Sequence, residues 1–206
     1  FKFVNNFIKL SNKVVELNGY NTSVNKNIII QNNLIDSASS GNGNVFNFNI
    51  ADSVYIQNNV IQNFVGSPTY AFQVTGYLNT SKLIINKNQL KNLNGGYGIF
   101  LQNCLGTVGS PLEVYNNMIS SRAGTNGNNG LYLSNCSYVN IYHNTIANRG
   151  TFNVYNNLLF QSFNNINIRN NIFVNTTNGA PNIKFNTTNF RWWLYTWRKF
   201  QFSYFR

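Results

Sequence analysis

The chain of 206 residues holds few side chains that could do acid–base, nucleophilic or metal chemistry. Its carboxylates are Glu16, Asp36, Asp52 and Glu113, which are widely separated along the sequence. Glycoside hydrolysis needs a pair of carboxylates beside the scissile bond, and a bound Ca²⁺ ion needs several clustered oxygen ligands. The sequence therefore predicts no catalytic pair, no metal site and no cofactor.

The only histidine, His143, stands where most other repeats of the pattern described below carry Asn. A lone His in such a position favours a structural role over a catalytic one. Lys87 and Arg169 lie near the same edge of the pattern and could bind an anion. Exposed lysine and arginine side chains are more commonly just solvated, and we favour that interpretation.

The two cysteines, Cys104 and Cys136, occupy the same column of adjacent repeats. Neighbouring strands lie about 4.8 Å apart, which is within the range that a disulfide can span. Stacked side chains point the same way, however, and this favours two buried free thiols. Both alternatives stay open, and no Cys/His spacing is typical of a zinc site.

The composition describes one folded chain with a scarcity of charge. Hydrophobic residues make up 43% of the chain and charged residues 9%, which is enough apolar material for a core. No apolar run is long enough to span a bilayer. The net charge is +11, but the basic residues are scattered and form no nucleic-acid-binding module. An acidic polysaccharide is the better-fitting partner, and nothing indicates an oligomeric state.

Both ends of the sequence are unusual. Residue 1 is Phe and the only Met is Met118, so we expect the natural start and any secretion signal to lie outside this sequence. Residues 190–206 hold all three Trp and no Asn. This tail could be a translated frameshift, because reading a Trp codon one base later gives a Gly codon. It could also be a cap over the core, or a segment that docks on a membrane or partner.

One six-residue phrase recurs throughout the chain: apolar, any residue, Asn or a similar residue, Asn, apolar, apolar. It first occurs as FVNNFI at 3–8 and last as IRNNIF at 168–173. The steps between the fixed Asn residues are 27, 26, 29, 29, 27 and 27 residues. These fixed residues are Asn6, Asn33, Asn59, Asn88, Asn117, Asn144 and Asn171.

Each repeat contains short strands and no helical pattern. Apolar residues alternate with variable ones ahead of the fixed Asn, which is the period of a β-strand. A second strand precedes each phrase, as in FNFNIA at 46–51 and LYLSNC at 131–136. Segments rich in Gly, Ser and Asn separate the repeats, as expected of loops.

A single repeat cannot bury its apolar face, but stacked repeats can, with like strands parallel and about 4.8 Å apart. The connection between such strands should be right-handed. The sequence thus predicts an all-β fold, a right-handed parallel β-helix over residues 1–189. We expect about 6–7 coils of roughly 27 residues, an incomplete first coil and a larger parent protein.

The fixed Asn has a structural explanation. It lies where one strand bends into the next, and Asn tolerates left-handed backbone better than most residues. Its amide can also bond to the same Asn in neighbouring coils, which builds a ladder. We interpret the seven fixed Asn as structural rather than as ligand-binding.

The phrases IYHNTIAN at 141–148 and IQNNVIQN at 56–63 resemble the parallel β-helix repeats of the pectate-lyase-like superfamily. The resemblance covers about residues 3–175 and implies an extracellular or cell-surface protein. That superfamily includes polysaccharide lyases, polygalacturonases, uronate epimerases, adhesins and phage spikes, so the fold alone selects no activity. The Asn-Thr-Asp, Asp-Asp, His-Gly and Arg-Ile-Lys motifs of polygalacturonases do not occur here.

In enzymes of this superfamily the substrate commonly lies along the outer face of the first strand of each coil. We take that strand to be the one before the Asn phrase. Its outward residues are mainly polar, with two aromatic rings as possible stacking platforms. The candidate carbohydrate-binding residues are Gln73, Phe100, Gln102, Tyr132, Ser134 and Gln161.

The sequence leaves three functional hypotheses. The first is a secreted or surface β-helix that binds or presents carbohydrate and has no complete catalytic site in this chain. The second is part of a polysaccharide lyase or epimerase whose site lies in coils outside this sequence. The third is a structural adhesin or spike stalk. Because paired carboxylates are missing, the interpretation leans against an enzyme.

Overall fold

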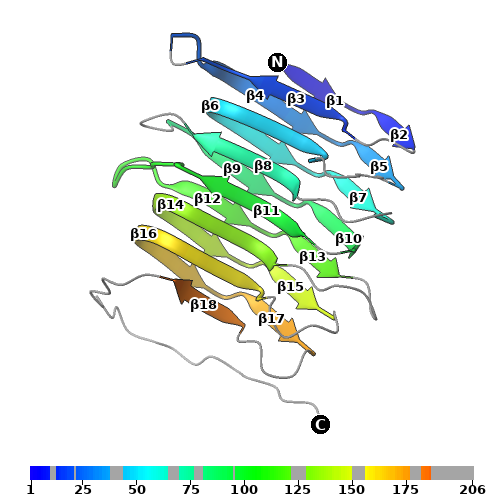
Figure 1. Ribbon diagram of the computed structural model, residues 1–206, viewed down its shortest axis with the longest axis vertical. Helices are drawn as coiled ribbons and strands as arrows, with labels where there is room; N and C mark the ends of the chain where they lie inside the picture. Colours follow the sequence, from blue (N-terminus) through cyan, green and yellow to red (C-terminus); the bar gives the residue numbers. More distant parts are fainter. Residues whose placement is uncertain are drawn as a thin grey trace.

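In the computed structural model the chain forms a stack of short β-strands that runs from β1 at one end to β18 at the other (Figure 1). No helix long and apolar enough to cross a membrane occurs among the described residues. The structure describes residues 1–9, 13–20, 22–37, 44–64, 70–76, 81–94, 96–121, 129–149, 156–176 and 182–186. The predicted tail at 190–206 lies outside these residues.

The larger sheet has eleven strands and contains two strands of each repeat. Its longest members, β6, β14 and β16, run through the bend between the two strand positions and join them into one sheet. The members are β1 (Lys2–Val4), β3 (Val15–Asn18), β4 (Asn25–Gln31), β6 (Phe46–Gln57), β8 (Tyr70–Gly76), β9 (Leu83–Asn86), β11 (Tyr97–Gln102), β12 (Leu112–Tyr115), β14 (Asn129–Tyr142), β16 (Leu158–Arg169) and β18 (Ile183–Asn186).

The smaller sheet has seven strands, and each follows a fixed Asn. Its order in space repeats the order in sequence. The members are β2 (Phe7–Lys9), β5 (Leu34–Asp36), β7 (Val60–Gln62), β10 (Gln89–Leu93), β13 (Met118–Ser121), β15 (Thr145–Asn148) and β17 (Ile172–Asn175).

The described strands pair in parallel with their equivalents one repeat away, as in β11 with β8 and β14. The fold is therefore an all-β parallel solenoid of about five turns with about 27 residues each, as the repeat predicts. The sequence prediction of 6–7 coils is higher because it includes the incomplete repeats at the two ends of the stack. Loop lengths absorb most of the variation in step, so the strands stay in register apart from shifts between β6 and β8 and between β10 and β13.

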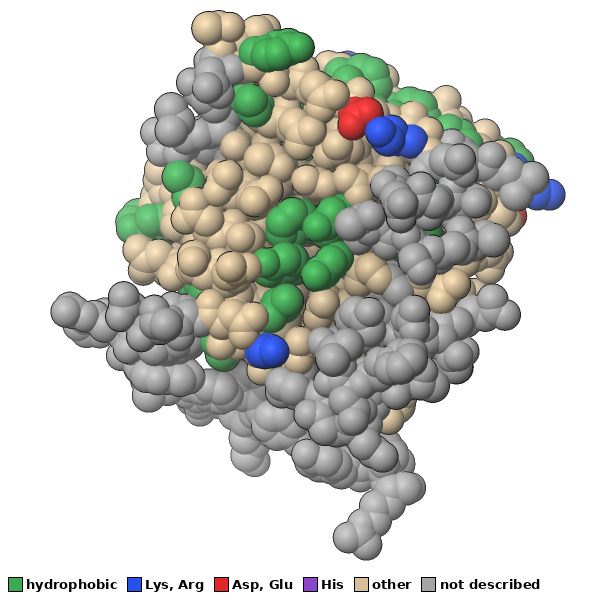
Figure 2. Space-filling view, viewed as in Figure 1, with side chains coloured by type: hydrophobic (Ala, Val, Ile, Leu, Met, Phe, Trp, Pro, Cys, Tyr) green, Lys and Arg blue, Asp and Glu red, His purple; other side chains and the backbone are tan. Residues whose placement is uncertain are grey.

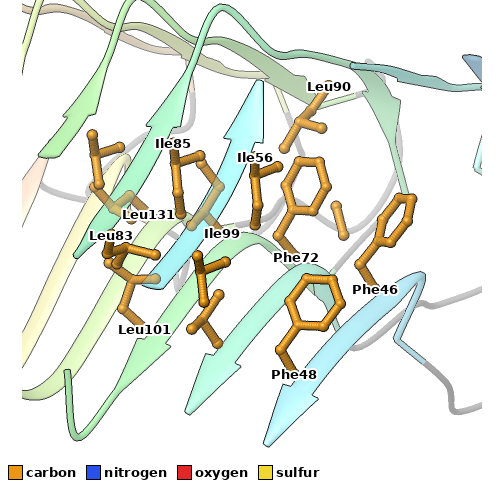
Figure 3. Close-up of a cluster of buried hydrophobic side chains, with 14 of the residues drawn as sticks. Phe46, Phe48, Ile56, Phe72, Leu83, Ile85, Leu90, Ile99, Leu101 and Leu131 are labelled. Carbon is orange, nitrogen blue, oxygen red and sulfur yellow. The ribbon is translucent and has the colours of Figure 1, made fainter. Parts of the chain in front are cut away.

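The core lies between the two sheets and is built from equivalent residues stacked turn upon turn (Figure 3). The predicted inward pairs Phe46/Phe48 and Leu131/Leu133 are buried. Phe46 stacks on Phe72 of the next turn, with 5.4 Å between ring centroids. Full burial of each large side chain contributes about 1.5–3 kcal/mol, so the stack of turns as a whole supplies the stability.

The fixed Asn residues form the predicted ladder inside the solenoid. Asn59 donates from its backbone nitrogen and from Nδ2 to Oδ1 of Asn88, at 3.0 and 2.9 Å. Its Nδ2 also donates to the carbonyl of Ile30 in the preceding turn, at 3.0 Å. The same pattern links Asn6, Asn33, Asn59, Asn88, Asn117, Asn144 and Asn171.

The left-handed backbone falls one residue before the ladder rather than on it. The fixed Asn is not among the residues with positive φ, whereas the residue that precedes it has a φ of 52–60° in every repeat. Asn fills this position in most repeats because it tolerates the conformation best among residues with a Cβ. The position comprises Asn5, Asn32, Asn58, Lys87, Asn116, His143 and Asn170.

Removal of one ladder amide should destabilise the solenoid more than removal of a surface amide. In Asn88→Ala the backbone nitrogen and Nδ2 of Asn59 both lose their acceptor while buried. We expect the free energy of unfolding to fall by about 2–3 kcal/mol, measured by urea denaturation. Asn140→Ala is the matched control, since its amide is only half-buried and bonds Asn167 near the surface. Equal losses in the two variants would contradict the ladder's role.

A close approach between turns at Gly130 gives a second stability prediction. A Cβ on Gly130 would lie 2.9 Å from the carbonyl oxygen of Asn157 and would overlap the side chain of Ile146. Gly130→Ala should therefore lower the free energy of unfolding by about 1–3 kcal/mol. Gly109→Ala, where no heavy atom lies within 4 Å of the new Cβ, should leave the unfolding midpoint nearly unchanged.

Candidate functional site

The strand register brings all six predicted carbohydrate-binding residues onto one outward face. On β8, β11 and β14, Gln73, Phe100 and Tyr132 lie side by side in one column. Two residues further along the strands a second column holds Gln102, Ser134 and Gln161. The side chains face outward because strand residues alternate and the intervening positions, such as Leu101 and Leu133, are buried in the core.

Two tyrosines that the sequence interpretation missed complete an aromatic cluster with Phe100 and Tyr132. The Phe100 ring stacks between Tyr70 and Tyr132, with centroids 4.7 and 4.8 Å away. The Tyr97 ring stacks against the same two tyrosines, at 5.0 and 5.3 Å. Figure 2 shows a group of apolar side chains amid uncharged polar surface on this side of the solenoid.

The two middle rings of the cluster, Tyr97 and Phe100, are covered on both faces by Tyr70 and Tyr132. Stacking within the cluster occupies the faces of Phe100, which is only 6% exposed. Phe100 therefore does not act as the open stacking platform that the sequence suggested. The rings of Tyr70, Tyr97 and Tyr132 lie on the same face, and phenol hydroxyls can both donate and accept hydrogen bonds.

The sequence interpretation missed Tyr70 and Tyr97 because the alternation of inward and outward residues is interrupted at the start of β11. Gly98 is buried, and a Cβ there would lie 2.9 Å from the Ile119 side chain, so its position faces the core rather than the surface. Tyr97 therefore points outward although simple alternation would place Gly98 there. The available signal was the pair of tyrosines at the same position in successive repeats, each three residues before a predicted site residue.

The polar groups on this face are held by hydrogen bonds. The hydroxyl of Tyr132 donates to Oε1 of Gln161 in the next turn. Oε1 of Gln73 accepts from Nδ2 of Asn44, at 2.5 Å. These bonds fix the amides and the phenol on rigid strands.

Glu16 lies in the same outward column as Gln73, two turns nearer the N-terminus. Glu16 accepts from Nζ of Lys13 at 2.8 Å and from Nδ2 of Asn47 at 3.1 Å. Hydrogen bonds from Lys13 and then Asn47 lower the pKa of this carboxyl, so it stays ionised at neutral pH. A single ionised carboxylate paired with Lys13 cannot serve as the acid and base pair of a hydrolase.

The other carboxylates lie in separate places. Asp36 accepts from Nδ2 of Asn63 at 2.8 Å, and this hydrogen bond lowers its pKa. Asp52 accepts from Ser81 in the next turn, at 2.6 Å. Within the described residues no three His, Cys, Asp or Glu side chains lie close enough together to hold a metal ion.

A second aromatic pair lies on the outer face of the following strand. Tyr115 and Tyr142 stack with centroids 4.9 Å apart and an interplanar angle of 3°. The guanidinium of Arg169 lies 5.3 Å from the Tyr142 ring centroid, and the His143 ring meets Tyr142 edge-on. The Arg169 side chain is thus placed by a cation–π contact, and His143 occupies the left-handed backbone position described above.

Comparisons with known proteins add no identification. No protein-family model matches the chain, and neither a curated protein nor a solved structure matches it significantly.

The clustered phenols give a prediction for alkaline pH. Burial, followed by the nearby Tyr97 and Tyr132, raises the pKa of Tyr70, so the folded state favours the neutral phenol. This stabilisation is complete below the unfolded pKa of about 10 and is lost as the pH rises through the folded pKa. In urea denaturation between pH 9 and pH 11, stability should fall less in Tyr70→Phe than in the unaltered chain. Tyr20→Phe, at a residue that is 72% exposed, should behave like the unaltered chain.

Proposed function

We propose that this chain is a carbohydrate-binding β-solenoid whose ligand lies on the outward face of β8, β11, β14 and β16. In this proposal the solenoid is right-handed, belongs with the pectate-lyase-like superfamily, and works outside the cell or at its surface. The observation that supports it most is the group of three phenols beside amide and hydroxyl side chains on one rigid face. This combination of ring edges and hydrogen-bonding groups suits the apolar and hydroxyl surfaces of a sugar.

The repeating geometry favours a polymer over a single sugar. Each column offers one side chain per turn, about every 4.8 Å along the solenoid. A chain of sugar units would therefore meet comparable polar groups, such as Gln102, Ser134 and Gln161, at successive turns. The net charge of +11 favours a neutral or acidic polysaccharide over a basic one.

The described surface supports binding without cleavage. Glu16 is engaged by Lys13, Asp36 and Asp52 accept hydrogen bonds from other partners, and Glu113 lies on β12. The uncharged part of the face around Gln102 and Ser134 holds no group that could act as a base at neutral pH. Hydrogen bonding to sugar hydroxyls is the chemistry that these side chains can perform.

The proposal can be tested on a glycan array with the purified chain, followed by calorimetric titration of the strongest ligand. Tyr132→Phe keeps the ring stack but removes the hydroxyl, and it should weaken binding by roughly fivefold to tenfold. Gln102→Ala should weaken binding by a similar factor. Tyr115→Phe, on the other outward face, is the matched control and should bind as tightly as the unaltered chain.

Two results would count against this function. Absence of binding to every glycan would favour a structural stalk. Release of new reducing ends or unsaturated products from polygalacturonate or alginate would show that the chain is an enzyme rather than a binding module.

A further inference from the structure

The two cysteines occupy equivalent places in adjacent turns of the solenoid. Both follow a left-handed Asn, since Asn103 and Asn135 each have a φ of 52°. Ser134 pairs with Gln102 just before them and Ser137 with Leu105 just after them, so Cys104 and Cys136 are direct neighbours across the strand pair. The backbone nitrogen of Ser137 donates to the carbonyl of Cys104 at 3.2 Å, which holds the two chain segments together.

Both thiols are in the core and form only weak hydrogen bonds. Cys104 is 0% exposed and Cys136 is 2% exposed. The Sγ atom of Cys104 lies 3.5 Å from the carbonyl of Val74, and that of Cys136 lies 3.4 Å from the carbonyl of Leu101. Both cysteines are free in the structure, in line with the favoured interpretation of the sequence. A hydrogen bond with Cys136, together with burial, raises the pKa of Cys104.

The backbone geometry permits these thiols to be joined. Paired strands bring equivalent Cα atoms to about 4.8 Å, inside the usual range for a disulfide. β11 ends at Gln102, so Cys104 lies beyond the regular strand and is the segment that can adjust, whereas Cys136 lies within β14 and pairs with Phe163 of β16. A disulfide requires the two Cβ atoms to approach to about 3.8 Å.

We propose that Cys104 and Cys136 form an intramolecular disulfide that fastens two adjacent turns together when the protein meets a mild oxidant. With a diazene such as diamide, one thiolate adds to the nitrogen–nitrogen double bond, and the second thiolate displaces the resulting hydrazine from sulfur. Two S–H bonds are lost, one S–S bond forms, and the diazene is reduced to a hydrazine with the two hydrogens. This inference is independent of any bound sugar.

Such a bond would constrain the chain between the two turns. It would close a loop that includes β12, β13 and the first part of β14. A disulfide limits the conformations of the unfolded chain, so the oxidised protein should unfold at a higher temperature. Because each turn of a solenoid is stabilised by its neighbours, the disulfide should also stabilise the adjacent turns against unfolding.

The test uses the whole chain, treated with diamide at a concentration that oxidises added glutathione completely. We expect the intact mass to fall by the mass of two hydrogens, both thiols to disappear together in a titration under denaturing conditions, and the melting temperature to rise by roughly 5–10 °C. Because burial slows the reaction, the incubation is repeated at temperatures up to just below the melting point.

The control variant is Cys136→Ser, which leaves one thiol and a small polar side chain. Its melting temperature should not respond to diamide, and dithiothreitol should reverse the mass change and the stabilisation of the unaltered chain. The proposal is overturned if both thiols survive the hottest incubation. It is equally overturned if oxidation yields dimers or oxygen adducts, or if it lowers the melting temperature.

Discussion

The stack of amides inside the solenoid is the interaction on which the rest of the structure depends. Each interior ladder Asn, such as Asn88, is an acceptor for two donors of the preceding turn and a donor to the following turn. A buried amide without partners would cost free energy, so each turn is stable only when its neighbours are in register. The ladder thereby fixes the start of the smaller sheet in every turn, and through it the position of each inward and outward side chain.

Much of this architecture could be predicted from the sequence because it repeats. The even steps between the fixed Asn residues predict the turns of the solenoid. The period-two apolar pattern predicts the strands, the inward pairs and the outward columns. The left-handed position was assigned one residue late, because Asn5 and Asn6 have the same side chain and only the backbone distinguishes them. Lys87 and His143 show that this bend does not require Asn, since both have the left-handed backbone. The fixed Asn one residue later is therefore needed for the ladder rather than for the bend.

The candidate face was less predictable than the core. Its six residues follow from alternation, but the way their rings pack does not. Tyr70 and Tyr97 join the cluster because small residues at the corner, such as Gly98, shift the alternation by one residue. Whether a ring offers its face or its edge depends on neighbours one turn away, as the near-complete burial of Phe100 shows. The residue pattern within one repeat cannot predict these contacts between side chains of different turns.

The placement of length variation in the loops has an evolutionary consequence. Steps of 26–29 residues leave the columns aligned because the difference falls between strands. Duplication or loss of one whole repeat would likewise preserve every column, whereas a change of a few residues within a strand would turn apolar side chains outward. The length of the outward face is therefore set by the number of repeats, and a lineage could lengthen or shorten that face while keeping the same core.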